Sequence, residues 1–262
     1  MQAVIPEKKY TPMNAEKSHG LALSGNTLKL IAAVSMLIDH AGVILFPDLM
    51  LLRVLGRLAF PLFAFMIAEG ARYTRNRLRY LLGIAVLGGF CQLVYLAVGG
   101  DWHMNTLLTF TLSILLIYSL DYAKRVLLTD GRTRTARILA VALPLLATAA
   151  AALLTAKVSF DYGFIGCTMP LLASLLSFRG LPVSERLARL DTVPNRALTM
   201  LFGLVPLCIK NGPLHLPSLL AVLLLFLYSG KRGRFRMKYF FYLFYPLHLA
   251  ILWGIYMLIH YL

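Results

Sequence analysis

Asp39 and His40, neighbours in an otherwise apolar stretch, are the side chains of this chain best suited to chemistry. A charged group at the centre of a bilayer costs about 2.5–3.5 kcal/mol even on the lenient insertion scale, so such residues tend to face a protein interior and mark a functional path. A neutral imidazole can accept a proton from an attacking amine or hydroxyl, and a nearby carboxylate can raise its basicity. The pair predicts catalytic roles, with His40 as general base; the structural alternative is that both only satisfy buried partners.

Arg53 and Arg57 follow in the next apolar stretch, one helical turn apart and therefore on one face of the expected helix. Arginines placed in this way can hold an anion or stabilise a developing negative charge, which predicts a catalytic role for Arg57 and donor binding for Arg53. They can equally serve as counter-ions for Asp39 and Glu69 in a structural network. The sequence leaves both interpretations open.

Lys29 and His248 extend the candidate site along the first and the last apolar stretch. Lys29 precedes His40 by eleven residues, about three turns or roughly 16 Å along one helix face, which indicates a cation near one membrane surface. His248 lies at a similar depth to His40, although a lone histidine on an apolar helix is often a hydrogen-bonded core residue. We expect His40, Arg57 and His248 to line one water-accessible cavity. Beyond Asp39-His40 no close spacing of metal ligands occurs, and we expect no metal.

The elements that must position these residues are membrane helices. Of the 262 residues 59% are hydrophobic and only 14% are charged, and the mean hydropathy is +0.74. The composition predicts an all-α, polytopic integral membrane bundle, with residues 1–26 as a flexible cytoplasmic segment and 27–262 as a single transmembrane domain. We expect about nine transmembrane helices, or eight if the short stretch 197–209 does not cross: 28–46, 51–71, 80–98, 105–122, 138–156, 161–178, 197–209, 216–228 and 239–261.

The positive charges are distributed unevenly between the two sides of these expected helices. Of the 26 Lys and Arg residues, 21 fall on one side, two on the other and three within spans. This asymmetry follows the positive-inside rule and puts the N-terminus in the cytoplasm, so the net charge of +15 does not indicate nucleic-acid binding. The clusters 72–79 and 231–238 mainly set topology, and they also lie where a cytoplasmic phosphorylated donor would enter.

Four stretches resemble the TraX family of conjugal transfer proteins. They are LKLIAAVSMLIDHAG, RVLGRLAFPLFAFMIAEGARYTRNR, the segment Asp161-Tyr162-Gly163, and the closing YSGKRG…KYFFYLFYPLHLAILW. The family is named for a membrane protein that N-acetylates the pilin subunit of a conjugative pilus. It also resembles integral-membrane acyltransferases that acetylate surface glycans from cytoplasmic acetyl-CoA. In that group the first helix carries an Arg eleven residues before an essential His; Lys29 and His40 keep the spacing with Lys in place of Arg. The group's Ser-Gly at the end of the second helix corresponds to Glu69-Gly70 here.

The resemblance implies a membrane-embedded acyltransferase of the bacterial cytoplasmic (inner) membrane. It would move an acyl group from cytoplasmic acyl-CoA, with acetyl-CoA as the expected donor, to an amine or hydroxyl acceptor such as a pilin-like N-terminus or a surface glycan. Its partners would be acyl-CoA, the acceptor and membrane lipid. We expect the catalytic residues to be Asp39, His40, Arg57 and His248. We expect donor contacts from Lys29, Arg53, Glu69, Arg72, Arg75 and Tyr245.

A multi-pass transporter or permease is the second hypothesis, with the buried charges serving as a substrate or proton path. Transporters often contain paired repeats with matching broken helices, and this chain has no internal repeat. A scaffold without catalysis leaves the Asp39-His40 pair unexplained. Consumption of acetyl-CoA by the purified protein, with and without an acceptor, separates these hypotheses.

Overall fold

The computed structural model describes residues 22–98, 100–235 and 237–261, and within them every secondary-structure element is a helix and none is a strand. Most of the expected N-terminal segment, residues 1–21, lies outside the described residues. The helices in order are α1 (Gly25–Ile44), α2 (Met50–Gly56), α3 (Ala59–Tyr73), α4 (Arg77–Ala97), α5 (Thr106–Leu128), α6 (Arg134–Lys157), α7 (Gly163–Ser174), α8 (Glu185–Leu190), α9 (Val193–Thr199), α10 (Leu201–Asn211), the 3-10 helix η1 (Pro213–Leu219), α11 (Leu220–Phe226) and α12 (Lys238–Tyr261). The all-α prediction is confirmed for this part of the chain.

Six helical segments are long and apolar enough to cross a membrane, so the chain is a membrane protein of several spans. They are α1, α2 together with α3, α4, α5, α6 and α12. The other three expected spans occur as shorter helices. Pro213 and Pro217 fall in or beside η1, and the stretch 197–209 is divided between α9 and α10 at Met200. Among the described residues the structure therefore has six helices of spanning length where the sequence predicts about nine.

The second span is interrupted between α2 and α3, at Arg57 and Leu58. A proline within a helix is expected to disrupt the turn before it, and Pro61 lies four residues after Arg57. Proline has no backbone N–H and its ring crowds the carbonyl four residues before it, so the helical hydrogen bond to the Arg57 carbonyl cannot form. Pro61 itself lies in the first turn of α3, where a missing N–H costs little. The break leaves Arg57 at the end of α2, facing α1.

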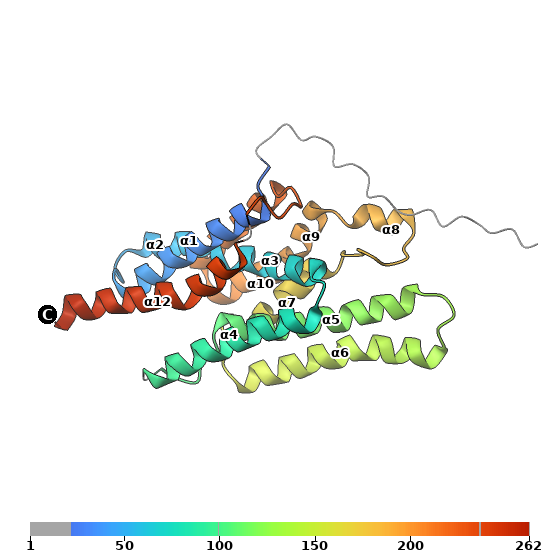
Figure 1. Ribbon diagram of the computed structural model, residues 1–262, viewed down its shortest axis with the longest axis horizontal. Coiled ribbons are helices and arrows are strands. Elements are labelled where there is room, and N and C mark those ends of the chain that lie inside the picture. The colour runs from blue at the N-terminus through green and yellow to red at the C-terminus, as the bar shows by residue number, and fades with distance from the viewer. Residues whose placement is uncertain (1–21, 99, 236, 262) are drawn as a thin grey trace, which may run out of the picture.

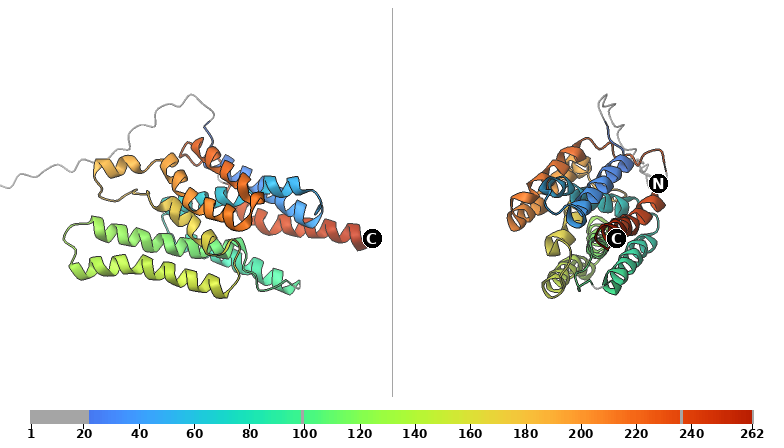
Figure 2. Two further views of the ribbon diagram at one scale, coloured as in Figure 1. Left: turned by 180° about the vertical axis from the view of Figure 1, so that it is seen from behind. Right: turned by 90° about the vertical axis from the view of Figure 1, so that its left-hand side faces the viewer.

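Helix α3 is the centre of the bundle. Eleven of its 15 residues are buried, and it packs against α1, α4, α5, α7, η1 and α11. Figure 1 shows α4, α5 and α6 on one side of it and α1 and α2 on the other, and α12 packs on α1. In the end-on view of Figure 2 most helices are seen nearly along their axes, so they run close to the long axis of the molecule. This direction is the one expected for helices that cross a membrane together.

A buried carboxylate near the end of α3 is held by two partners from other helices. Glu69 is 6% exposed, and its Oε1 accepts a hydrogen bond of 2.5 Å from Nη2 of Arg196, which is 3% exposed. The Tyr228 hydroxyl donates to Oε2 at 3.0 Å. Arg53 and Arg57, which the sequence suggested as counter-ions of Glu69, do not pair with it, and that prediction is wrong. Glu69 lies toward the opposite end of α3 from the break at Arg57, so those arginines are in another part of the bundle.

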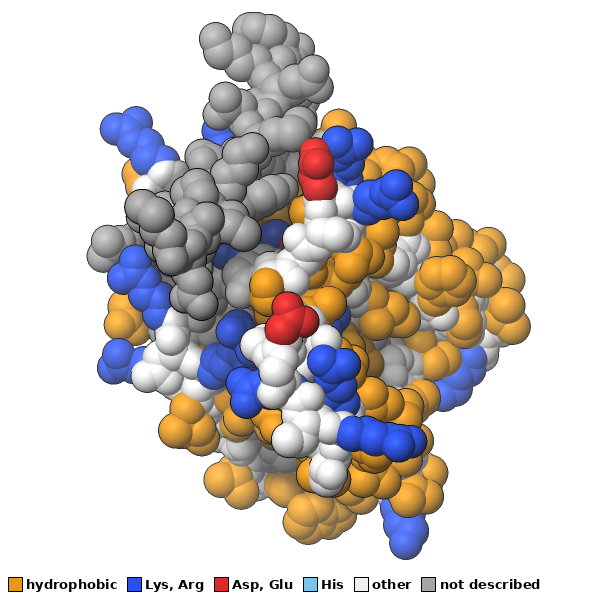
Figure 3. Space-filling view, turned by 90° about the vertical axis from the view of Figure 1, so that its right-hand side faces the viewer, with side chains coloured by type: hydrophobic (Ala, Val, Ile, Leu, Met, Phe, Trp, Pro, Cys, Tyr) orange, Lys and Arg blue, Asp and Glu red, His pale blue; other side chains and the backbone are white. Residues whose placement is uncertain are grey.

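Positive side chains gather at one end of the molecule, onto which Figure 3 looks. This end carries α8, the turn between α3 and α4 and the turn between α5 and α6 (Figure 1). We expect it to face the cytoplasm because Lys and Arg are retained on that side during insertion.

Single-cysteine labelling in cells tests this orientation. Asp101 and Arg132 lie beyond opposite ends of α5. In a variant without the three native cysteines, Asp101→Cys should react with an impermeant maleimide from outside, and Arg132→Cys only after the membrane is permeabilised. Reaction of both from one side would mean that α5 does not span. The reversed pattern would invert the topology.

Removing one partner of the Glu69–Arg196 pair should destabilise the protein more than removing the charges of both. Arg196→Met leaves a buried carboxylate without its counter-charge, which typically costs about 3–5 kcal/mol. Adding Glu69→Gln removes that charge and should restore most of the loss, as measured by unfolding in detergent. The matched control is Arg189→Met, whose partner Glu185 is on the surface with side chains 73% and 71% exposed, and it should change stability by less than about 1 kcal/mol. Equal losses in the single and double variants would contradict this reading.

Candidate functional site

The imidazole rings of His40 on α1 and His248 on α12 lie in direct contact. The His40 Nδ1 and the His248 Nε2 are 2.9 Å apart, and the His248 Nδ1 is 2.8 Å from the carbonyl oxygen of Phe244. A carbonyl oxygen can only accept, so the His248 Nδ1 carries the proton and its Nε2 is the acceptor. His40 must then donate from Nδ1, which leaves the lone pair on its Nε2. The helix α12 thus selects the tautomer of His40 that can act as a base.

His248 is held rigidly, which lets it orient His40. Its residue is 3% exposed, and its ring stacks on Phe244 with centroids 5.0 Å apart and an angle of 9°. Phe244 lies one turn earlier on the same helix, so the carbonyl bond and the stacking come from the same residue. Among the described residues the His40 Nε2 has no hydrogen-bond partner. It is the free basic nitrogen of this pair.

Asp39 does not bond its neighbour His40. It bonds the two arginines of the second span. Its Oδ1 accepts from Nη2 of Arg57 at 2.5 Å, and its Oδ2 accepts from Nη1 of Arg53 at 3.3 Å. Gly56 makes this approach possible, because a Cβ there would lie 2.3 Å from the Cβ of Asp39. Of the two interpretations of the arginines, the geometry shows the counter-ion role toward Asp39 directly.

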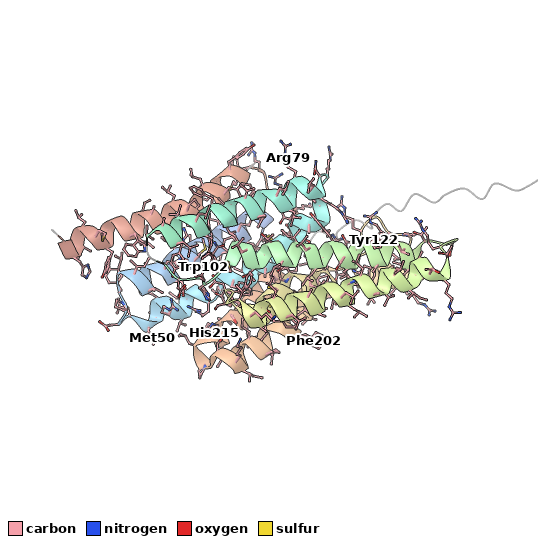
Figure 4. The ribbon with its side chains drawn as sticks, turned by 90° about the horizontal axis from the view of Figure 1, so that it is seen from below. Met50, Arg79, Trp102, Tyr122, Phe202 and His215 are labelled. Atoms are coloured by element: carbon pink, nitrogen blue, oxygen red, sulfur yellow. The ribbon has the colours of Figure 1, made fainter. Side chains whose placement is uncertain are left out.

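Arg57 has little capacity left for a ligand. Its Nε donates to the Arg53 carbonyl at 3.1 Å and its Nη1 donates to Nε2 of His215 at 3.2 Å, in addition to the bond with Asp39. Arg57 is 7% exposed, whereas the side chain of Arg53 is 27% exposed and has one long contact. An anion in this region could therefore accept hydrogen bonds from the guanidinium of Arg53. From Arg57 it would feel the positive charge but find few free N–H groups. Figure 4 shows the position of His215, and its helix η1 packs on α2.

A cavity of about 480 Å³ opens beside these groups, and we call it the His40 cavity. Its charged lining residues are Asp39, Arg53, Arg57, Asp161 and Lys210, three cations against two carboxylates. His40 and Arg57 share this cavity as the sequence analysis expected. His248 is not among its lining residues, so the expectation that it shares the cavity is wrong; it is buried and bonded to the Nδ1 of His40 instead.

A second cavity of about 530 Å³, the Lys29 cavity, adjoins the first. It is lined by Lys29 on α1 together with Glu69 and Arg232. Four residues line both cavities, and so form the wall or passage between them: Met36, Phe63, Thr106 and Tyr245. Because Lys29 and His40 are on one helix, a molecule long enough to fill both cavities would extend from the cation to the imidazole.

The remaining donor-binding candidates are divided. Tyr245 and Glu69 line the Lys29 cavity, although Glu69 is already bonded to Arg196 and Tyr228. Arg72 bonds Asp191 and the Ser177 hydroxyl. Neither Arg72 nor the exposed Arg75 is among the described residues that line either cavity. These two arginines lie near the positive end of the molecule, outside the assembled site.

The structure adds residues that the sequence analysis did not assign to the site. His215 follows a glycine and a proline in an apolar turn, and a polar ring in that context was the available signal. Arg232 belongs to the cluster that the sequence analysis connected with a phosphorylated donor. Arg196 belongs to a basic stretch that the sequence places between two spans, and no neighbouring residue indicates that its side chain is buried. For a metal, no three His, Cys, Asp or Glu side chains converge within the described residues.

The arrangement can perform proton transfer beside a positively charged cavity. His40 offers a lone pair directed by His248, and the surplus of cations favours negative charge that develops in the same space. The Lys29 cavity supplies a second, more apolar space with cations at its border. Both features are typical of a site that binds an elongated anionic donor and activates a nucleophile.

Comparison with known proteins gives matches over most of the chain. The profile of the family described as TraX protein matches residues 24–256. A probable fimbrial assembly protein FimC, serogroup H1, of Dichelobacter nodosus is 30% identical over 252 residues, which is 90% of this chain and 96% of that protein. An uncharacterized protein of Rickettsia prowazekii (strain Madrid E) is 47% identical over 38 residues, 14% of this chain and 15% of that protein. No solved structure matches significantly.

The contact between the two histidines predicts a stability difference between two variants. His248→Phe leaves the partly buried Nδ1–H of His40 without its acceptor, which costs roughly 1–3 kcal/mol. His248→Gln offers an amide oxygen and should lose less. Unfolding of both variants in detergent measures the difference. If Phe is tolerated as well as Gln, the bond between the rings contributes nothing to the fold.

Proposed function

Because the chain belongs to the TraX protein family, we propose that it is a membrane-embedded acyltransferase. It moves an acyl group, most simply acetyl, from cytoplasmic acyl-CoA to an amine or hydroxyl acceptor. The observation that carries the proposal is the free Nε2 of His40, held in its basic tautomer by His248, in a cavity that adjoins a second one bordered by Lys29. A general base at one end and a cation at the other match the two ends of a thioester donor.

The donor enters through the Lys29 cavity. Lys29 and Arg232 line it, and their charges favour the phosphates of coenzyme A. Within the described residues Lys29 makes no ion pair and lies 5.9 Å from the ring of Phe241, so its ammonium is available to a phosphate. The narrow chain that ends in the thioester then passes Met36 and Phe63 into the His40 cavity.

The reaction is a direct transfer in its simplest form. The acceptor nitrogen or oxygen attacks the thioester carbonyl carbon while the Nε2 of His40 takes its proton. Negative charge develops on the carbonyl oxygen beside Arg53 and Arg57, which stabilise it electrostatically. The C–S bond breaks, and the leaving thiolate takes the proton from the His40 imidazolium. Asp39 keeps the two arginines in place and so acts through them.

The acceptor approaches the His40 cavity from the end that carries the fewest positive charges, which is the outer side if the chain lies in the bacterial inner membrane. The relative from Dichelobacter nodosus is named a probable fimbrial assembly protein. A pilin-like N-terminal amine is therefore the acceptor that we favour, and a surface-glycan hydroxyl is the second. Either acceptor requires only a general base and enough space to reach the carbonyl carbon of the thioester.

Replacing His40 by Gln tests the base directly. The variant keeps a hydrogen-bonding side chain of similar size but loses the titratable nitrogen, and transfer should fall about 100- to 10,000-fold. Release of CoA from acetyl-CoA is followed with the purified protein, with and without a pilin-derived peptide or a glycan. Binding of CoA should survive, since Lys29 and Arg232 remain.

Lys29 supplies the matched contrast for the same assay. Lys29→Ala should raise the KM for acetyl-CoA with a smaller effect on kcat, and Lys29→Arg should retain most activity. A folded His40→Gln protein that works at the wild-type rate would rule out the mechanism. A wild-type protein that leaves acetyl-CoA intact with every acceptor while moving a solute across vesicles would favour the transporter instead.

A further inference from the structure

A serine, a histidine and an aspartate form a continuous hydrogen-bonded series at the rim of the His40 cavity. The His103 Nδ1 is 2.7 Å from the Ser159 hydroxyl, and the His103 Nε2 is 2.8 Å from Oδ1 of Asp161. Ser159 and Asp161 both line the His40 cavity. The three residues come from two loops, one before α5 and one before α7, and none of them is used in the direct transfer described above.

The protonation of this series follows from its partners. A carboxylate accepts, so the His103 Nε2 carries the proton and donates it to Asp161. The Nδ1 then has the lone pair, and the Ser159 hydroxyl donates to it. This is the arrangement in which an imidazole removes the proton of a serine nucleophile while a carboxylate fixes its tautomer, with the two ring nitrogens exchanged relative to the usual order.

The carboxylate is itself oriented by a residue at the junction of the two cavities. Thr106 donates from its hydroxyl to Oδ2 of Asp161 at 2.5 Å, and the Thr109 hydroxyl donates to the Asp161 carbonyl at 3.0 Å. Thr106 lines both the His40 cavity and the Lys29 cavity. The series therefore lies where a thioester that arrives from the Lys29 cavity would enter the His40 cavity.

Holding the two loops together does not require these side chains. Backbone hydrogen bonds already join them, from the Met104 N–H to the Ser159 carbonyl at 2.8 Å and from the Asp161 N–H to the Met104 carbonyl at 2.9 Å. The side chains of His103 and Asp161 are 42% and 34% exposed, so they are open to a reactant.

The backbone next to Asp161 adds a further sign of a functional segment. Tyr162 has a φ of +61°, the one positive φ of a non-glycine residue among the described residues. A bulky residue in this conformation is strained, and such strain clusters at functional sites. The ring of Tyr162 stacks on Phe60 with centroids 3.7 Å apart, which fixes the segment beside the cavity.

We infer that Ser159 is a nucleophile that receives the acyl group before the acceptor does, an inference that rests on the proposed acyltransferase function. The Ser159 oxygen attacks the thioester carbonyl carbon and passes its proton to the Nδ1 of His103. The C–S bond breaks, and the CoA thiolate takes that proton from His103, leaving an acyl ester on Ser159.

In the second half of the reaction the acceptor nitrogen or oxygen attacks this ester. The Nε2 of His40 takes the acceptor proton, the bond between the carbonyl carbon and the Ser159 oxygen breaks, and the proton returns through cavity water to that oxygen. The site thus has two bases with separate tasks, His103 for the serine and His40 for the acceptor. An acyl-enzyme lets the donor leave toward one side of the membrane before the acceptor binds from the other.

The experiment incubates the purified full-length protein with acetyl-CoA and no acceptor. A burst of up to one equivalent of CoA should appear, and peptide mass spectrometry should find the acetyl group on Ser159. Ser159→Ala should abolish the burst, and His103→Asn should slow it about 100- to 10,000-fold. Ser159→Cys keeps a nucleophile and should still be acetylated. Thr148→Val, whose hydroxyl bonds its own helix at Pro144, is the matched control and should behave as wild type.

The outcomes separate this inference from the proposed function. If Ser159→Ala, shown to be folded by its unfolding temperature, transfers acetyl to an acceptor at the wild-type rate, the acyl-serine is wrong and direct transfer stands. If the wild type releases no CoA under any condition, the acyltransferase function fails, and the acyl-serine fails with it. Acetylation of Ser159 that disappears on addition of acceptor supports both.

Discussion

The structure depends on the pairing of its most deeply buried charges, in an interior from which bilayer and packed side chains exclude water. An unpaired ion there is far more expensive than a paired one, so each buried charge fixes the position of its partner. Glu69 and Arg196 join α3 to α9, and Asp39 with Arg53 and Arg57 joins α1 to α2. These contacts set the positions of the helices that surround both cavities.

The two ion-pair clusters have different consequences because they differ in burial and in spare hydrogen-bonding capacity. Arg196 is 3% exposed, and the carboxylate it holds is also capped by Tyr228, so this cluster is structural. Asp39 neutralises part of the charge of two arginines at the edge of a cavity, which leaves a net positive space next to His40. The same physical requirement therefore stabilises the bundle at one place and prepares an environment for negative charge at another.

The histidines show how a helix can control chemistry without touching a reactant. A carbonyl oxygen on α12 fixes the proton of His248, and His248 in turn fixes the proton of His40 on α1. An aspartate performs this task for many catalytic histidines, and here the adjacent Asp39 is occupied by arginines. A neutral orienting group stabilises the imidazolium less than a carboxylate does. It also adds no negative charge, so the net positive charge of the cavity remains to act on the substrate.

The sequence by itself determined what depends on local geometry. The apolar composition indicated a helical membrane protein, the eleven-residue spacing placed Lys29 and His40 on one helix, and the motifs around Asp39-His40 indicated the family. The break at Arg57 also has a local cause, because Pro61 removes the helical hydrogen bond one turn before itself. The ends of helices and the spans that prolines divide were harder to predict from the sequence. Three of the expected spans are shorter than a bilayer requires.

Only the tertiary structure decided which residues meet across helices. His40 and His248 are 208 positions apart, Glu69 and Arg196 are 127 apart, and no periodicity along one helix specifies the neighbour that a side chain faces. The sequence for this reason offered Arg53 and Arg57 to both acidic residues, whereas the bundle gives them to Asp39 alone. The sequence likewise did not connect His103, Ser159 and Asp161, because their proximity arises when the turns before α5 and α7 pack together at one end of the bundle.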